Sequence, residues 1–210
     1  MEKKILKAMY SSIVSKDPIR PIMTGVFFDQ NCCVATDTHM LVVFKHTNPK
    51  FAGKVMSASG EEIPGKFPDY NRVFPAKEKL SKFHPRIDLA QLQKACAWFS
   101  RQPGFTEKDS VVIRGKGLSI KFLGNILSLI ALTPEIKSAE MLQTPEGNAA
   151  VIKSKSFRAL LMPLTVDESK VDAPREEECP VTLTLENLIN MFVFEGWKPK
   201  PQEDPMAWMD

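Results

Sequence analysis

The sequence has 210 residues, of which 43% are hydrophobic and 25% charged, a composition typical of a soluble globular protein with one or two domains. No apolar run approaches the roughly 20 residues of a membrane-spanning helix, and no signal-peptide cleavage site follows the basic N-terminus, so we expect a cytoplasmic protein. The net charge is +3, but residues 1–165 carry +10 and residues 166–210 carry −7. This asymmetry favours an anionic partner for the basic part, nucleic acid first, over a merely solvated surface.

The four cysteines form no paired-thiol motif. Cys32 and Cys33 are sequence neighbours, which bridge only through a strained ring, and Cys96 and Cys179 stand alone. We therefore expect buried, reduced thiols in a cytosolic protein. No Cys/His cluster accompanies them, so the sequence predicts no metal and no cofactor.

Helical spacing of apolar residues predicts an amphipathic helix over residues 2–15, which the Asp17-Pro18 pair ends. Its buried face is expected to hold Ile5, Leu6, Met9, Tyr10, Ile13 and Val14. Three strands are predicted next, at residues 21–28, 32–36 and 40–45, because these runs are rich in β-branched and aromatic residues.

Residues 46–86 contain five prolines and predict a long connection between two parts of the chain. A second helix is expected over residues 88–101, with Asp88 as its N-cap. Further strands are predicted at residues 110–114, 118–122, 126–132, 149–154 and 157–166. A helix followed by strands thus occurs twice, which predicts an α+β fold with two helices packed on antiparallel sheets.

Residues 20–44 read RPIMTGVFF…VATDTHMLVVF, residues 65–75 read GKFPDYNRVFP, and residues 158–166 read RALLMPLTV. These stretches resemble, in the same order, three motifs of the bacterial DNA polymerase III sliding clamp (β subunit) family: RPxLxGVxxE…VATDGHRLAV, GRFPDYRRVLP and YVVMPMRL. The similarity covers about 45 residues directly. The resemblance implies the DNA-clamp (processivity-factor) fold, with Arg20 in a structural role.

Clamps of this family have three similar domains per chain, and two chains close a ring around DNA. This sequence matches the front of the middle domain and the back of the last one. We therefore expect residues 1–166 to form one clamp-like domain, a composite of two α–β halves joined by residues 46–86. Residues 167–210 form an acidic, Pro-rich C-terminal extension. Whether the chain forms a homo-oligomer or a closed ring stays open.

The resemblance implies a surface pocket for short linear peptides of DNA polymerases and repair factors. Its residues would be Thr36, His39, Leu41, Pro68, Arg72, Val73, Leu160, Met162 and Pro163. Such an apolar cleft with polar groups at its rim suits an apolar peptide anchor. At two positions this chain departs from the motif, with Thr38 in place of glycine and Met40 in place of arginine. The alternative is that these residues only determine the fold.

The resemblance also implies that the helices face double-stranded DNA and bind phosphates without reading the sequence. The candidate residues are Lys3, Lys4, Lys7, Lys94 and Arg101. A second candidate patch in the connection comprises Lys50, Lys54, Lys66 and Lys77. The sequence thus predicts a clamp-like replication or repair accessory protein, with a pure peptide-binding adaptor as the alternative.

Catalysis is not expected. Asp37 and His39 could suggest a metal or acid–base site together with His46 and His84, but no HExxH motif and no Gly-rich phosphate loop accompanies them.

Residues 188–192 read LINMF, which is similar to clamp-binding peptides. One hypothesis is that Ile189, Met191 and Phe192 dock into the protein's own pocket. The alternative is that residues 181–194 add a strand and a helix to the core.

Overall fold

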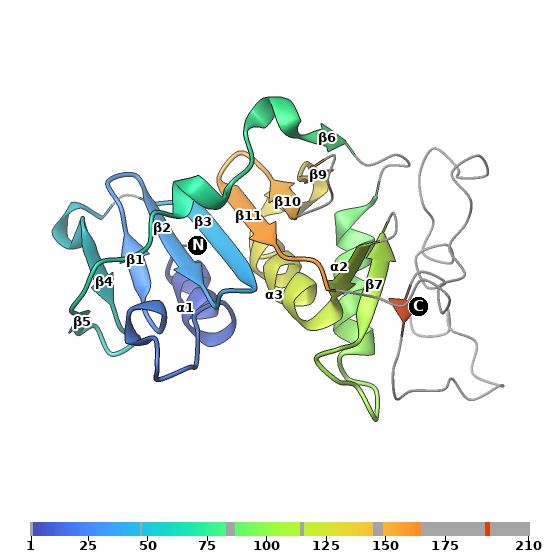
Figure 1. Ribbon diagram of the computed structural model, residues 1–210, viewed down its shortest axis with the longest axis horizontal. Coiled ribbons are helices and arrows are strands. Elements are labelled where there is room, and N and C mark those ends of the chain that lie inside the picture. The colour runs from blue at the N-terminus through green and yellow to red at the C-terminus, as the bar shows by residue number, and fades with distance from the viewer. Residues whose placement is uncertain are drawn as a thin grey trace.

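The computed structural model describes residues 2–46, 48–82, 87–113, 116–144, 149–164 and 192–193. Within these residues, nine strands form one sheet in the order β5-β4-β1-β2-β3-β11-β10-β9-β6, and three form a second sheet in the order β12-β7-β8 (Figure 1). The three α-helices of the described residues are α1 (Glu2–Ser12), α2 (Leu89–Phe99) and α3 (Ile120–Ile130). The strands are β1 (Val26–Phe28), β2 (Cys32–Thr36), β3 (Met40–Lys45), β4 (Lys54–Met56), β5 (Glu62–Ile63), β6 (Ser81–Lys82), β7 (Ser110–Ile113), β8 (Lys116–Ser119), β9 (Glu140–Gln143), β10 (Ala150–Lys153), β11 (Phe157–Leu161) and β12 (Phe192–Val193).

The large sheet is continuous because β3 from the first half of the chain pairs with β11 from the second. The pairing is antiparallel and runs from Met40 opposite Leu161 to Phe44 opposite Phe157. Successive side chains of a strand point to opposite faces. Phe157 and Leu161 therefore join the core beneath the sheet, whereas Leu160 joins a second apolar cluster on the outer face.

Helices α1 and α3 lie behind the large sheet, and α2 packs against α3 and lies behind β7 of the second sheet (Figure 1). Ser119 caps α3 by accepting a hydrogen bond from the Phe122 backbone N–H at 3.5 Å. Ile120, Leu123 and Leu127 follow at helical spacing and are each fully buried. No helix among the described residues has both the length and the apolar character that crossing a bilayer requires.

The α+β fold class is confirmed, and β2 and β3 have the predicted bounds. The strands predicted at residues 118–122 and 126–132 are wrong, because β8 ends at Ser119 and α3 follows it. A short apolar run buried on most sides has no clear period, so a buried helix is easily mistaken for strands. The helix layer consequently has a third member.

Smaller corrections concern segment ends. Helix α1 stops at Ser12, because the chain turns and the Ser15 N–H bonds to the carbonyls of Met23 and Thr36. The predicted strand over residues 21–28 begins only at Val26, since Pro21 starts a 3₁₀ turn. Helix α2 ends at Phe99 rather than at residue 101. The connection over residues 46–86 contributes three short strands (β4, β5 and β6), and β9 was not predicted.

The turn between β10 and β11 is held by one carboxylate. Glu135 accepts hydrogen bonds from Ser154 Oγ at 2.6 Å, from the Ser156 N–H at 2.9 Å and from Ser156 Oγ at 2.7 Å. Burial acts to raise the pKa of Glu135, but these hydrogen bonds outweigh it, and the pKa lies below its ordinary value of 4.5.

Replacing Glu135 with Gln should lower the free energy of unfolding by about 1 kcal/mol at pH 7, since charge-assisted hydrogen bonds are lost from a partly exposed site. A lowered folded-state pKa stabilises the protein above the ordinary glutamate pKa, and this contribution disappears as the pH falls through the folded value. Urea denaturation from pH 7 to pH 3 should therefore show the two proteins converging in acid. A difference that stays constant with pH would contradict this assignment.

Candidate functional site

The turn between β2 and β3 is a dense hydrogen-bonded loop. Asp37 Oδ1 accepts from the His39 N–H at 2.9 Å and from the Met40 N–H at 2.8 Å. Thr36 Oγ1 donates to the Met40 carbonyl at 2.7 Å and accepts from the Thr38 N–H at 3.1 Å. These bonds force Thr38 to a φ of 81°, a conformation that suits glycine and is rare for a β-branched residue. This explains structurally why the clamp motif has glycine there.

Replacing Thr38 with Gly should raise the free energy of unfolding by about 1 kcal/mol, because the strain of the left-handed conformation exceeds the entropy cost of glycine. The Thr38→Ala variant keeps the Cβ atom and serves as the control, for which we expect a smaller gain. Urea denaturation of the three proteins measures the effect. A glycine variant no more stable than the alanine variant would show that Thr38 is unstrained.

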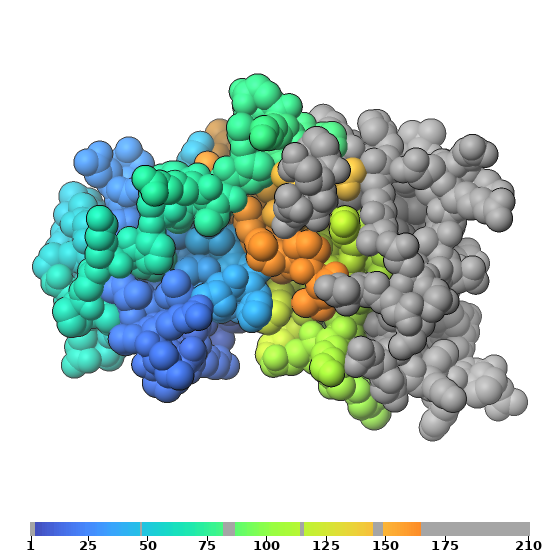
Figure 2. All heavy atoms as spheres, viewed as in Figure 1, coloured from blue at the N-terminus to red at the C-terminus, as the bar shows by residue number. Residues whose placement is uncertain are grey.

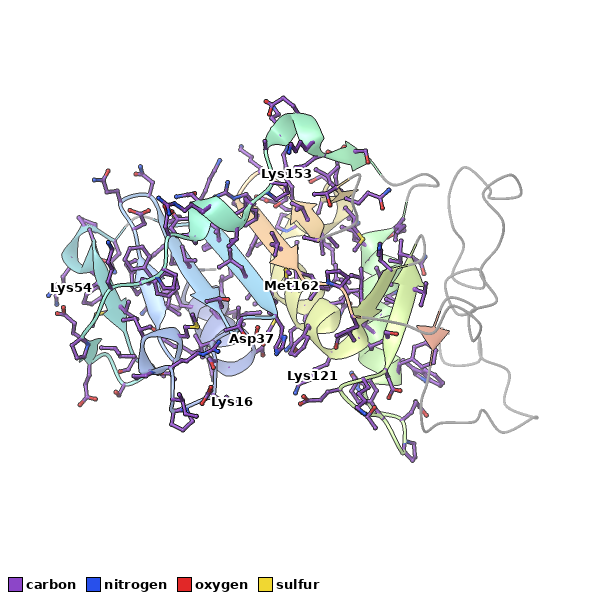
Figure 3. The ribbon with its side chains drawn as sticks, viewed as in Figure 1. Lys16, Asp37, Lys54, Lys121, Lys153 and Met162 are labelled. Atoms are coloured by element: carbon purple, nitrogen blue, oxygen red, sulfur yellow. The ribbon has the colours of Figure 1, made fainter. Side chains whose placement is uncertain are left out.

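The first and last motifs meet beside this turn. The Met162 N–H donates to the His39 carbonyl at 2.9 Å, and Leu41 lies opposite Leu160 in the β3–β11 pair. Thr36 is the cross-strand neighbour of Leu41. Figure 3 shows Asp37 and Met162 close together at this junction, with Lys121 of α3 beneath them. Residues more than 100 positions apart thus form one continuous surface.

The middle motif lies across the outer face of the sheet, where Figure 1 shows its segment crossing in front of β2 and β3. The Phe67 ring stacks on Phe27 with a centroid distance of 4.9 Å. The Tyr70 hydroxyl donates to Asp29 Oδ2 at 2.7 Å and lies 3.3 Å from Cys32 Sγ. Burial, followed by these hydrogen bonds, raises the pKa of Tyr70 above its usual range. The aromatic residues of the motif therefore anchor the connection to β1 and β2.

Replacing Tyr70 with Phe should lower the free energy of unfolding by about 1 kcal/mol, because Asp29 loses its phenolic donor while the ring still packs. Replacing Tyr70 with Ala should cost roughly 3 kcal/mol, since the ring also leaves the outer cluster. Thermal and urea unfolding measure both. Equal losses in the two variants would contradict a separate role for the hydroxyl.

Of the connector candidates, Arg72 and Val73 lie on the 3₁₀ turn Tyr70–Val73, beside β11, and Pro68 precedes this turn. Arg158 fixes this turn to β11, because its Nη2 donates to Asn71 Oδ1 at 3.1 Å and its guanidinium lies 3.9 Å from the centroid of the Phe74 ring. Pro68 and Arg72 are exposed, and Arg72 pairs with Asp69 at 3.2 Å. The structure therefore brings the connector turn next to the strand that carries Leu160 and Met162.

Two of these residues expose apolar side chains. Val73 is 56% and Met162 45% exposed, and they are two of the four exposed large hydrophobic residues in the described part of the chain. Leu41 and Leu160, by contrast, are buried at 5% exposure each. The surface therefore offers exposed apolar contact area at two of the predicted site residues.

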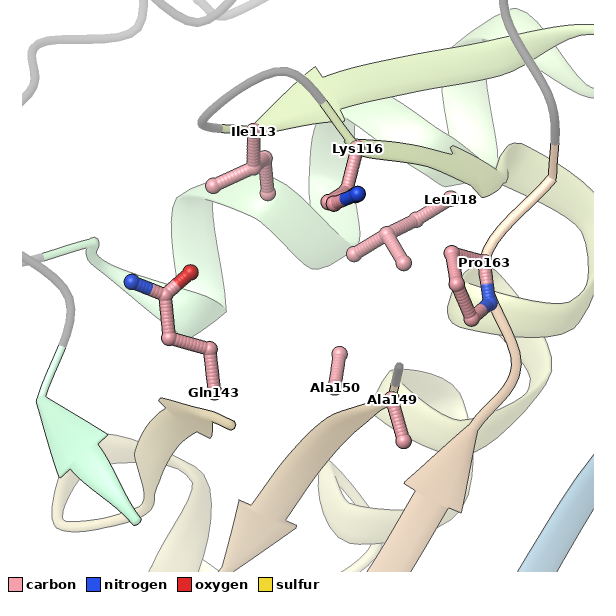
Figure 4. Close-up of a pocket in the computed structure, with 7 residues that line it drawn as sticks. All are labelled: Ile113, Lys116, Leu118, Gln143, Ala149, Ala150 and Pro163. Carbon is pink, nitrogen blue, oxygen red and sulfur yellow. The ribbon is translucent and has the colours of Figure 1, made fainter. Parts of the chain in front are cut away.

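Pro163 points elsewhere, into a hollow between the two sheets (Figure 4). Its lining is mostly apolar and comprises Ile113, Lys116, Leu118, Gln143, Ala149, Ala150 and Pro163. The hollow was not predicted from the sequence, because it forms between β7–β8 and β9–β10, and these strands meet only in the tertiary structure. The candidate site is thus a surface at the β3–β11 junction with this hollow beside it.

His39 contacts the helix layer. Its ring stacks on Phe122 of α3 with a centroid distance of 5.2 Å and an interplanar angle of 13°. Lys121 lies 5.8 Å from the Phe122 ring centroid and pairs with Glu107. The hydrogen bond and charge of Lys121 lower the pKa of Glu107, with a smaller effect from His39.

The helix layer is basic. The three α-helices of the described residues carry five lysines and one glutamate, a net charge of +4. Lys3, Lys4 and Lys7 of α1 are exposed, as are Lys94 of α2 and Arg101 just after it. Lys121 was missed in the sequence analysis because its segment was predicted as a strand.

Asp37 has a structural role, since its carboxylate closes the β2–β3 turn. Among the described residues, no group of three His, Cys, Asp or Glu side chains is placed to hold a metal ion. His84 and Cys179 lie outside the described residues. So do residues 181–191, whereas Phe192 lies in β12 and pairs with Val111 of β7, consistent with the interpretation that this segment adds a strand.

Solved structures of bacterial sliding clamps share this fold. DNA polymerase III subunit beta from Borrelia burgdorferi superposes with a TM-score of 0.58 at 13% identity over 80% of this chain, and the Caulobacter crescentus beta sliding clamp with 0.59 at 16% identity over 78%. The Pseudomonas aeruginosa subunit gives 0.56 at 13% identity over 78%. In each case the match covers 64% of the clamp chain. No protein-family model and no curated protein matches the sequence. The chain therefore has the fold of the bacterial DNA polymerase III β sliding clamps, in a shortened form.

Proposed function

We propose that this chain is a non-enzymatic, cytoplasmic accessory protein of DNA replication or repair that binds short linear peptides of its partners. The observation that supports the proposal is the meeting of Thr36, Leu41, Leu160 and Met162 at the β3–β11 junction, and we propose that they form part of a peptide-binding groove. The connector turn with Val73 lies beside it. We propose that residues 1–166 act as one composite clamp-like unit.

The groove suits a peptide with an apolar anchor. Exposed Val73 and Met162 offer apolar contact area to such an anchor. The backbone of the turn and Arg72 provide polar groups that fix the direction of a bound peptide. The Borrelia burgdorferi clamp has been solved with a natural product, and the Bartonella birtlesii clamp with griselimycin, which supports ligand binding by proteins of this fold.

A second proposed activity is sequence-independent binding of double-stranded DNA through the helix layer. Its support is the net charge of +4 on the three α-helices of the described residues, which lie behind the two sheets in the view of Figure 1. Lysines on a helix layer contact phosphates without reading bases. The alternative is an adaptor that uses the groove alone, with the helix lysines merely solvated.

Two titrations test the proposal. A fluorescently labelled peptide ending in Gln-Leu-Ser-Leu-Phe should bind with a dissociation constant in the micromolar range, and a version with both leucines and the phenylalanine replaced by alanine should not. Labelled duplex DNA should bind at 50 mM salt and weaken steeply at 200 mM salt. Peptide binding without DNA binding would identify the adaptor. Absence of both would reject the proposed function.

A further inference from the structure

The central strand of the second sheet, β7, is paired with β8 on one side and with the two-residue strand β12 on the other. All four residues of β7 are buried, from Ser110 at 2% to Val111 at 0% exposure, and three of the four are β-branched. Such a strand is typical of a sheet interior. An apolar strand of this kind, left at an edge, pairs readily with another chain.

Each side of the β7–β8 hairpin is paired with a later segment of the chain. On the β8 side, the Leu164 N–H donates to the Gly117 carbonyl at 2.7 Å. On the β7 side, β12 pairs antiparallel, with Phe192 opposite Val111 and Val193 opposite Ser110. Among the described residues, it is β12 of the C-terminal extension that pairs with this side of β7.

We propose that β12 occupies the edge of β7 that would otherwise pair with a second copy of this chain. The C-terminal extension thereby keeps the protein monomeric. The pairing of β12 involves two residues, so few backbone hydrogen bonds hold it and its displacement is inexpensive in free energy.

A second copy of this chain fits the edge that β7 presents once β12 is displaced. Two β7 strands related by a two-fold axis pair antiparallel and place the same β-branched residues opposite one another. Val111, Val112 and Ile113 have no charge that opposes such pairing. The edges of the large sheet are already blunted, because β5 and β6 are two residues long. Edge-to-edge association therefore concentrates at β7.

The test uses the full chain with prolines at both positions of β12 (Phe192→Pro and Val193→Pro), since proline cannot donate to a ladder. A matched control (Phe192→Tyr and Val193→Ile) keeps strand-forming residues. Light scattering after size exclusion should give 23.6 kDa for the wild type and the control. The proline variant should approach twice that mass, with a dissociation constant on the order of micromolar.

A peptide with the sequence of residues 188–197 should return the proline variant to a monomer, whether that variant dimerises or aggregates. Failure of the peptide to do so overturns the proposal. So does a proline variant that stays monomeric up to about 100 μM, or a wild type that already self-associates to the same extent.

Discussion

Reversing the charge of the five exposed cations on the helix layer should weaken the binding of duplex DNA by at least about 100-fold at 50 mM salt. The variant carries glutamate at Lys3, Lys4, Lys7, Lys94 and Arg101, all of which are exposed. Each cation that neutralises a phosphate releases a counterion on binding. With five such contacts, the wild-type affinity should fall roughly 500-fold between 50 and 200 mM salt. Fluorescence anisotropy with a labelled duplex of mixed sequence measures both quantities.

The matched control makes the same change of charge away from the helices. It carries glutamate at Lys50, Lys66, Lys77, Lys79 and Lys153, which are also exposed. The control should lose affinity far less than the helix variant, because its charges lie on the connection and at the end of β10. If the control loses DNA binding and the helix variant keeps it, the connection is the DNA face. If neither binds less tightly, DNA binding does not depend on these lysines.

Placing aspartate at both exposed apolar residues of the groove should weaken peptide binding by about 30-fold or more, which corresponds to about 2 kcal/mol. The variant is Val73→Asp together with Met162→Asp. Both side chains are largely exposed, at 56% and 45%, so the fold should tolerate the change. The carboxylates remove apolar contact area and must be desolvated when the anchor binds. Titration of the labelled peptide measures the loss.

The control places aspartate at Ile19 and Leu132, which are exposed by 85% and 41% and lie in neither candidate element. It has the same change in charge and apolar surface, and we expect it to bind the peptide like the wild type. DNA binding should be unaffected in both variants except for a small loss from the added negative charge. Equal peptide affinity of the groove variant and the control would place the peptide site elsewhere.

Local patterns in the sequence determined a large part of this fold. The bounds of β2 and β3 follow from their β-branched content, and Asp88 caps α2 by accepting from the N–H groups of Ala90 and Gln91, as its position predicts. The order of the three motifs also indicated a clamp-like fold. These features depend on propensity, capping and turn chemistry, which involve residues close together in the chain.

Tertiary structure alone decided the rest. The apolar run of α3 fits a helix or a strand, and only packing against the other helices and the large sheet selected the helix. The pairing of β3 with β11 brought the first and last motifs together, and the strain at Thr38 appears only once the turn is closed. The two-residue strand β12 has no periodicity to detect. These contacts join residues that are distant in the chain, and their free energy depends on which surfaces meet. Local sequence patterns therefore do not reveal them.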